Sequence, residues 1–234
     1  TLSRGLGDVY KRQCKYCIMD VVRLLLDKGA DVNQAVSKGL EEKDQTPLYI
    51  ACEKGHVEAA QLLLEKGAEV DQANKDGVTP LFIACEKGHV DAARLLLDKG
   101  ADASRATKKG TTPLSIARKK GHSAVVALLE EHLDSKFPLH AAARTGDVDA
   151  MTQLPDAGEV DQTLGDGVTS LYIACEKGHV EVARLLLDKG AGVDRASRNG
   201  KTPLFIACKD GHADVARLLF CLLYTSDAAD ELCR

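Results

Sequence analysis

Four cysteine–histidine pairs are the residues of this sequence whose types and spacing could do chemistry. Each histidine follows its cysteine by four positions: Cys52 and His56, Cys85 and His89, Cys175 and His179, Cys208 and His212. A thiolate and an imidazole held close together could bind zinc, or could act as a nucleophile with its general base. The elements that carry these pairs decide whether either reading holds.

Two features of the sequence argue against a metal or catalytic site. A glycine separates the cysteine from the histidine in every pair, as Gly88 does for Cys85 and His89, so the pair does not share one helix face. Packed helices lie about 8–10 Å apart, whereas zinc–ligand distances are about 2 Å, so equivalent cysteines in adjacent units should not share a metal. We therefore predict that the cysteines are small buried hydrophobes, with no catalytic residue, cofactor or metal.

The stretch DGVTPLFIACEKGHVDAARLLLDKGAD, residues 76–102, shows which elements surround one pair. Thr79-Pro80 predicts a helix start, because the threonine hydroxyl can cap free N–H groups and proline is tolerated at the first helical position. Gly88 predicts the end of this helix, and a second one follows as far as Lys99-Gly100. Two helices of about ten residues are marginal alone and need neighbours. The neighbours are further copies of the same unit, which predicts a solenoid.

The start of this unit recurs along the chain. Thr-Pro-Leu stands at residues 46, 79, 112 and 202, with degraded forms at Phe137-Pro138-Leu139 and Thr169-Ser170-Leu171. Thr-Pro-Leu-x-x-Ala, then Gly-His, then Leu-Leu-Leu, then Gly-Ala-Asp closely resembles the ankyrin repeat, across residues 14–220. The resemblance implies an all-α solenoid of paired antiparallel helices with β-turn or hairpin loops, which binds other proteins. It also implies that the histidine of each Gly-His is structural.

The repeat pattern divides the chain into four parts. Residues 14–136 form a first sub-array and 137–220 a second, because the step from Thr112 to Phe137 lacks a turn, Leu133 replaces the stop glycine and Glu130 stands on an apolar position. One continuous stack with a trimmed turn is the alternative. Residues 1–13 and 221–234 break the pattern: DVYKRQ (8–13) and CLLYTS (221–226) can be encoded by one DNA word read on both strands. Both resemble a translated sequencing adapter, so we expect non-native tails, against the alternative of natural ones.

Composition limits the functional class. The chain carries a net charge of −4 and eight cysteines, shows no signal peptide, and lacks an apolar run near the ~20 residues of a membrane span. Such cysteines favour reduced thiols in an intracellular, cytoplasmic protein, with a nuclear location left open. No phosphate loop or catalytic triad stands outside the repeats. We expect a monomeric, non-catalytic interaction scaffold; the alternative is a regulatory or targeting arm of a larger enzyme or membrane protein.

The resemblance implies a binding surface on the turn tips and on the exposed ends of the first helices. The candidate partner-binding residues are Lys75, Asp76, Glu86, Lys87, Lys108, Lys109, Lys119, Lys120, Arg198, Asn199 and Lys201. The repeat around 105–120 is strongly basic and favours an acidic protein partner; a merely solvated charged face is the alternative. Nucleic acid is disfavoured, since the chain is acidic overall and no aromatic residues accompany the patch.

Two further expectations concern single positions. The fourth residue of the marker is Tyr49, Phe82, Tyr172 or Phe205 in four repeats; we favour packing against the next turn over recognition anchors. Pro155 replaces the third leucine of a second helix, where a helical proline costs about 3 kcal/mol. Replacing it with leucine is expected to raise stability.

Overall fold

The structure, a computed structural model, describes residues 19–35, 44–153 and 160–223. Contacts between Cα atoms group the chain into two units, 1–132 and 133–234, which are described separately. The predicted division after residue 136 stays a prediction. Pro155 and nearly all of the two adapter-like tails lie outside the described residues.

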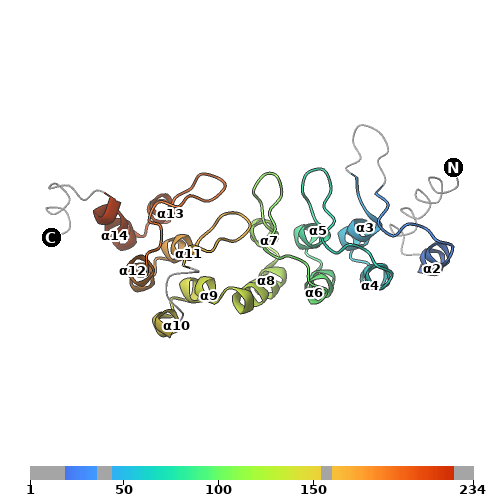
Figure 1. Cartoon of the computed structure of the whole chain (residues 1–234), viewed down its shortest axis with the longest axis horizontal. Helices are drawn as coiled ribbons and strands as arrows, with labels where there is room; N and C mark the ends of the chain where they lie inside the picture. Colours follow the sequence, from blue (N-terminus) through green and yellow to red (C-terminus); the bar gives the residue numbers. More distant parts are fainter. Residues whose placement is uncertain (1–18, 36–43, 154–159, 224–234) are drawn as a thin grey trace. The chain divides into compact units, whose positions relative to one another are not determined.

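Unit 1 is built of helices joined by turns. Its first helices, α3, α5 and α7, pack in sequence order, and the second helices α4 and α6 also contact each other. In Figure 1 the turns preceding α5 and α7 project on one side of the row α3–α5–α7, and α4 and α6 lie on the other side. The helices are α2 (Met19–Asp27), α3 (Pro47–Lys54), α4 (Val57–Glu65), α5 (Pro80–Lys87), α6 (Val90–Asp98), α7 (Pro113–Lys120) and α8 (Ser123–Lys136), the last of which crosses the division.

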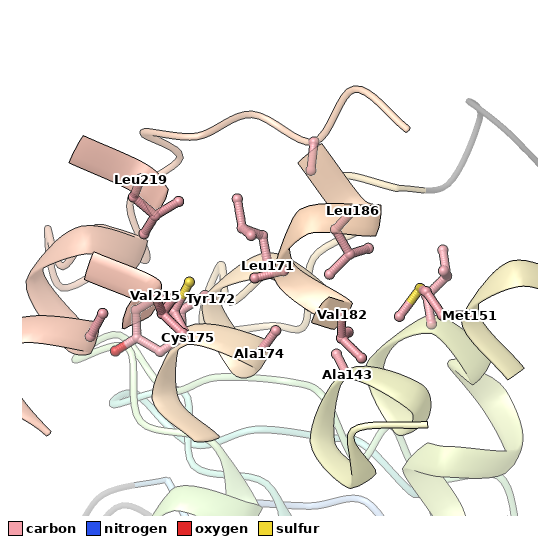
Figure 2. Close-up of a cluster of buried hydrophobic side chains, with 14 of the residues drawn as sticks. Ala143, Met151, Leu171, Tyr172, Ala174, Cys175, Val182, Leu186, Val215 and Leu219 are labelled. Atoms are coloured by element: carbon pink, nitrogen blue, oxygen red, sulfur yellow. The ribbon is translucent and has the colours of Figure 1, made fainter. Parts of the chain in front are cut away.

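Unit 2 repeats the arrangement. The first helices α9, α11 and α13 pack in order, and so do the second helices α10, α12 and α14. Leucine, valine, alanine and methionine side chains from both rows fill the core, among them Met151, Leu171, Leu186 and Leu219 (Figure 2). The helices are α9 (Pro138–Thr145), α10 (Val148–Gln153), α11 (Ser170–Lys177), α12 (Val180–Asp188), α13 (Pro203–Lys209) and α14 (Ala213–Leu223).

The threonine of each marker caps the first helix as predicted. Thr79 Oγ1 accepts a hydrogen bond from the backbone N–H of Phe82 at 3.1 Å, and Thr169 does the same for Tyr172 at 3.2 Å although serine replaces its proline. Phe137, which replaces the threonine before α9, makes no side-chain cap. The first helix α5 has 8 residues and the second helix α6 has 9, slightly fewer than expected.

The glycine that ends a first helix also makes room for the following repeat. Gly88 has φ 78°, and its N–H bonds to the carbonyl oxygens of Ala84 and Cys85. A Cβ placed on Gly88 would lie 2.7 Å from Nδ1 of His122, in the next repeat. His122 Nε2 in turn lies 3.0 Å from the carbonyl oxygen of Glu86. Because a carbonyl can only accept, Nε2 carries the proton and donates it to the preceding repeat.

This glycine–histidine contact recurs within both units. In each case Nε2 of the histidine lies 3.0–3.2 Å from the carbonyl oxygen two residues before the glycine. The further pairs are Gly55 with His89, Gly146 with His179, and Gly178 with His212. His89, His179 and His212 are therefore structural, as predicted, and they bind the preceding repeat rather than their own.

A second set of backbone bonds joins neighbouring turns. The N–H of Lys108 donates to the carbonyl of Asp76 at 3.0 Å in unit 1, and Arg198 donates to Asp166 at 2.8 Å in unit 2. The buried side chain of Asn74 supports the first turn by accepting from the N–H groups of Asp76 and Val78. Turns and first helices are thus both fixed by bonds to the repeat before them.

The short step near residue 134 lengthens a helix. α8 has 14 residues, and only Phe137 separates it from α9. With the buried Leu133 in place of the stop glycine, the chain has no residue suited to the left-handed conformation, so the helix continues. Glu130, on an apolar position of the pattern, accepts a bond from Arg118 Nη2 at 2.7 Å.

Replacing Gly88 with alanine should destabilise the fold more than the same change at Gly121. Both glycines have almost equal φ, 78° and 77°, so both variants pay about 1–2 kcal/mol for a left-handed alanine. Only at Gly88 does the new Cβ collide with a histidine; at Gly121 it meets no described atom within 4 Å. Overpacking should add about 1–3 kcal/mol, measured as the free energy of unfolding in urea. Equal losses would show that the histidine contact tolerates a Cβ.

Candidate functional site

In three of the four cysteine–histidine pairs the cysteine is buried and protonated. Cys52, Cys85 and Cys175 are fully buried, as predicted. Burial raises the pKa of Cys85 and Cys175 to about 12 and that of Cys52 further still, helped by the nearby Cys85. These residues are thiols at neutral pH, whereas nucleophiles and metal ligands are thiolates. Among the described residues, no three His, Cys, Asp or Glu side chains gather as a metal site.

The fourth cysteine departs from the prediction. Cys208 is exposed, so its assignment as a buried core residue is wrong. It lies on α13, and no described helix pair follows α13–α14 to cover it as α13 covers α11. Phe205 on the same helix is 50% exposed for the same reason.

The fourth marker position is a packing position in the repeats that another repeat follows. Tyr49, Phe82 and Tyr172 are all buried, which confirms packing there over recognition. His140 holds this position in α9 and is also buried, with Nε2 3.3 Å from the carbonyl of Val168 and Nδ1 3.3 Å from the hydroxyl of Ser170. Burial lowers the pKa of His140, so the neutral imidazole fills this place.

At the turn tips of unit 1, backbone groups join neighbouring turns and the lysine side chains are exposed. The Asp76 carbonyl receives the bond from Lys108, while the side chains of Lys108 and Lys109 are exposed. Lys75 is exposed as well, and its ammonium lies 3.0 Å from Asp44 Oδ2. This tip carries three exposed lysines on two hydrogen-bonded turns.

At the ends of the first helices, too, a backbone group joins two repeats and the lysine side chains are exposed. The Glu86 carbonyl receives the bond from His122, and its carboxylate lies 3.9 Å from Lys120 Nζ. Lys87, Lys119 and Lys120 are exposed at the last turns of α5 and α7. The structure therefore carries these side chains on two helices that pack directly against each other.

The basic repeat is less positive than its sequence indicates, because carboxylates reach it from elsewhere in the chain. Glu86, from the preceding repeat, pairs with Lys120, and Glu130, from α8, pairs with Arg118. Arg105 donates from Nη1 to the carbonyl of Asp71 at 3.2 Å. Sequence reasoning missed these contacts because they join residues 12 to 34 positions apart.

The candidates of unit 2 form a separate set. Arg198 and Asn199 are exposed at the turn before α13, and Lys201 is half-buried. The backbone of Arg198 bonds to Asp166, whose pKa is raised by burial, against the opposing effect of the Arg198 charge. This tip carries two basic side chains, Arg198 and Lys201, against three at the tip of unit 1.

One positioning residue in each unit escaped the sequence analysis. Asp71 accepts from the N–H of Asp102 at 3.1 Å, and Asp161 accepts from the N–H of Gly192 at 3.0 Å. Each aspartate follows a valine shortly before a turn, a recurrence that could have identified it. They tie successive turns together. No helix among the described residues has the length and apolarity to cross a bilayer.

Thiol accessibility should differ sharply between equivalent cysteines. Iodoacetamide added to the native chain should modify Cys208 while Cys52, Cys85 and Cys175 stay unmodified, because their thiolates are disfavoured and the sulfurs are buried. Peptide mapping by mass spectrometry measures the extent at each site, and labelling in denaturant provides the reference. Rapid native labelling of Cys85 would contradict the packing described here.

The two partners of the Glu86–His122 contact should respond differently to substitution. Glu86→Gln keeps the carbonyl that His122 uses and loses only a long, exposed ion pair, so unfolding free energy should change by less than about 0.5 kcal/mol. His122→Ala removes the donor and leaves that carbonyl unbonded, at about 1–3 kcal/mol. Urea unfolding compares the two variants. Equal destabilisation would mean that the Glu86 side chain, rather than its backbone, holds the repeats together.

Comparison with known proteins agrees with this geometry. The family model described as ankyrin repeats (3 copies) matches residues 13–107, 71–138 and 139–229. No curated protein matches the chain. The matched stretches cover most of the sequence and coincide with the helix pairs, turns and interlocking histidines described above. The chain belongs to the ankyrin-repeat family.

Proposed function

We propose that this chain is a non-catalytic scaffold that holds a protein partner against its turn tips and first-helix ends. Its family is one of protein–protein interaction domains. The observation that carries the proposal is the division of labour at these positions: backbone groups of Asp76, Glu86 and Lys108 form the bonds between repeats. The side chain of Lys108 is exposed, whereas those of Asp76 and Glu86 are half-buried.

The size of a protein interface supports the use of several repeats at once. A specific complex buries about 800 Å² on each partner, more than one turn tip offers. In unit 1, two tips and two first-helix ends lie on consecutive packed repeats. Because these positions are fixed before binding, little conformational entropy is lost when a partner docks.

The proposal includes a monomeric chain in the cytoplasm. Cys52, Cys85, Cys175 and Cys208 are free thiols, which suits a reducing compartment. Cys221 is disulfide-bonded, so the expectation of reduced thiols is wrong at that position. The buried positions of the first three leave them as core residues whose replacement by small apolar residues would preserve the surface.

Affinity capture with cross-linking tests this function. The full chain, immobilised and incubated with lysate, should enrich a protein that a lysine-reactive reagent joins to Lys75, Lys87, Lys108 or Lys109. Lys28 and Lys66, which follow the second helices α2 and α4, are exposed internal controls. Enrichment equal to that of the heat-unfolded chain, or cross-links confined to the two control lysines, would refute the proposed surface.

A further inference from the structure

We propose that four lysines of unit 1 bind an acidic segment of a partner protein. They are Lys87, Lys108, Lys109 and Lys119, called the lysine cluster below. The inference rests on the proposed function and names the chemistry of the partner. Lys108 and Lys109 stand at the turn before α7, Lys87 at the end of α5, and Lys119 at the end of α7 (Figure 1).

The lysine cluster is what remains after the neighbouring charges have paired. Lys75 is matched by Asp44, Lys120 by Glu86 and Arg118 by Glu130. No carboxylate among the described residues forms an ion pair with any lysine of the cluster, and all four side chains are exposed. The local field at this part of unit 1 is therefore positive, although the chain as a whole carries −4.

Equivalent helix ends elsewhere are neutralised by their own neighbours. Lys54 lies 3.6 Å from Glu53, and Lys177 lies 3.8 Å from Glu176. Lys209 at the end of α13 lies 3.3 Å from Asp210. Where those helices carry one cation in the last turn, α7 carries Arg118, Lys119 and Lys120. Arg118 and Lys120 are paired with Glu130 and Glu86, so Lys119 is the cation of α7 that is available to a ligand.

Backbone hydrogen bonds and helix packing fix the positions from which the lysine side chains extend. Lys108 is held by the bond from its N–H to Asp76, and Lys87 directly follows Glu86, whose carbonyl binds His122. The helices α5 and α7 that carry Lys87 and Lys119 pack against each other. The backbone positions of these lysines are therefore ordered before a partner binds. Only the lysine side chains lose conformational entropy on binding.

An acidic protein segment fits the cluster better than a single-stranded nucleic acid. Nucleic acid binding of that kind relies on aromatic side chains that stack on bases. Tyr49 and Phe82 are buried, and α7 has Ser115 at the corresponding position. No aromatic side chain among the described residues of unit 1 is exposed beside the lysines. Carboxylates of a peptide need only the ammonium groups.

Fluorescence anisotropy with a defined probe tests the inference. The probe is a short fluorescein-labelled peptide of alternating glutamate and serine. An oligothymidylate of equal charge is measured in the same way, as the nucleic acid to compare with it. The full chain should bind the peptide, more weakly as salt is raised. Lys108→Glu/Lys109→Glu/Lys119→Glu should raise Kd roughly tenfold or more, as expected for the loss of three exposed ion pairs. The corresponding glutamine variant should lose less.

A control variant separates the cluster from net charge. Lys28→Glu/Lys66→Glu/Arg94→Glu makes the same charge change on exposed residues of the second-helix side of unit 1, and it should keep the wild-type Kd. Circular dichroism and urea unfolding confirm that each variant is folded. An unchanged Kd in the cluster variant, an equal loss in the control, or no peptide binding by the wild type would overturn the inference.

The remaining outcomes distinguish this inference from the proposed function. If oligothymidylate binds more tightly than the peptide and depends on the same lysines, the ligand is a nucleic acid and the inference is wrong. If a captured protein still cross-links to the turn tips when the charges of the lysine cluster are reversed, the scaffold function is supported. The inference that the cluster binds an acidic segment is then wrong. If the wild type captures no protein although it binds the peptide, the scaffold function fails instead.

Discussion

The hydrogen bond from a histidine ring to a backbone carbonyl of the preceding repeat is the contact on which each stack depends. It needs three things at once: a helix that ends at a glycine, no Cβ at that glycine, and a histidine at the start of the next second helix. A single helix pair of eight and nine residues cannot bury its own apolar face. The histidine fixes how the next pair must sit, so the cores of successive repeats merge into one.

Local chemistry could be predicted from the sequence because it depends on neighbours along the chain. Thr79 as a cap, Gly88 as a stop and Cys85 as a core residue all follow from residues within a few positions, and all are confirmed. Cys208 could not be predicted, since its burial depends on a following repeat rather than on its own helix. The length of α8 follows from Leu133, which lacks the left-handed freedom of glycine, but where the helix would then end was not evident.

The candidate binding surface could likewise be predicted from the sequence only in part. That Lys108 and Lys119 are exposed follows from their places in the repeat pattern. Which cations stay unpaired does not, because Glu86 and Glu130 approach from other segments only once the chain has folded. A count of charges along the sequence therefore overestimates the positive charge of the basic repeat. The ion pairs seen in the structure leave fewer unpaired lysines as candidates for binding.

Because the histidine contacts main chain, the identity of the neighbouring side chain is irrelevant to docking: Glu53, Glu86, Arg144 and Glu176 all present the same oxygen. The repeats that carry this histidine can in principle follow any repeat whose first helix ends at such a glycine; the repeat that begins at Phe137 has Asp147 instead of the histidine. A gene encoding such an array can gain, lose or exchange whole units by recombination without redesigning their junctions. Selection for binding a partner can then change the side chains at the helix ends without affecting the bonds that hold the repeats together. The binding specificity of such an array can therefore change quickly while its fold stays the same.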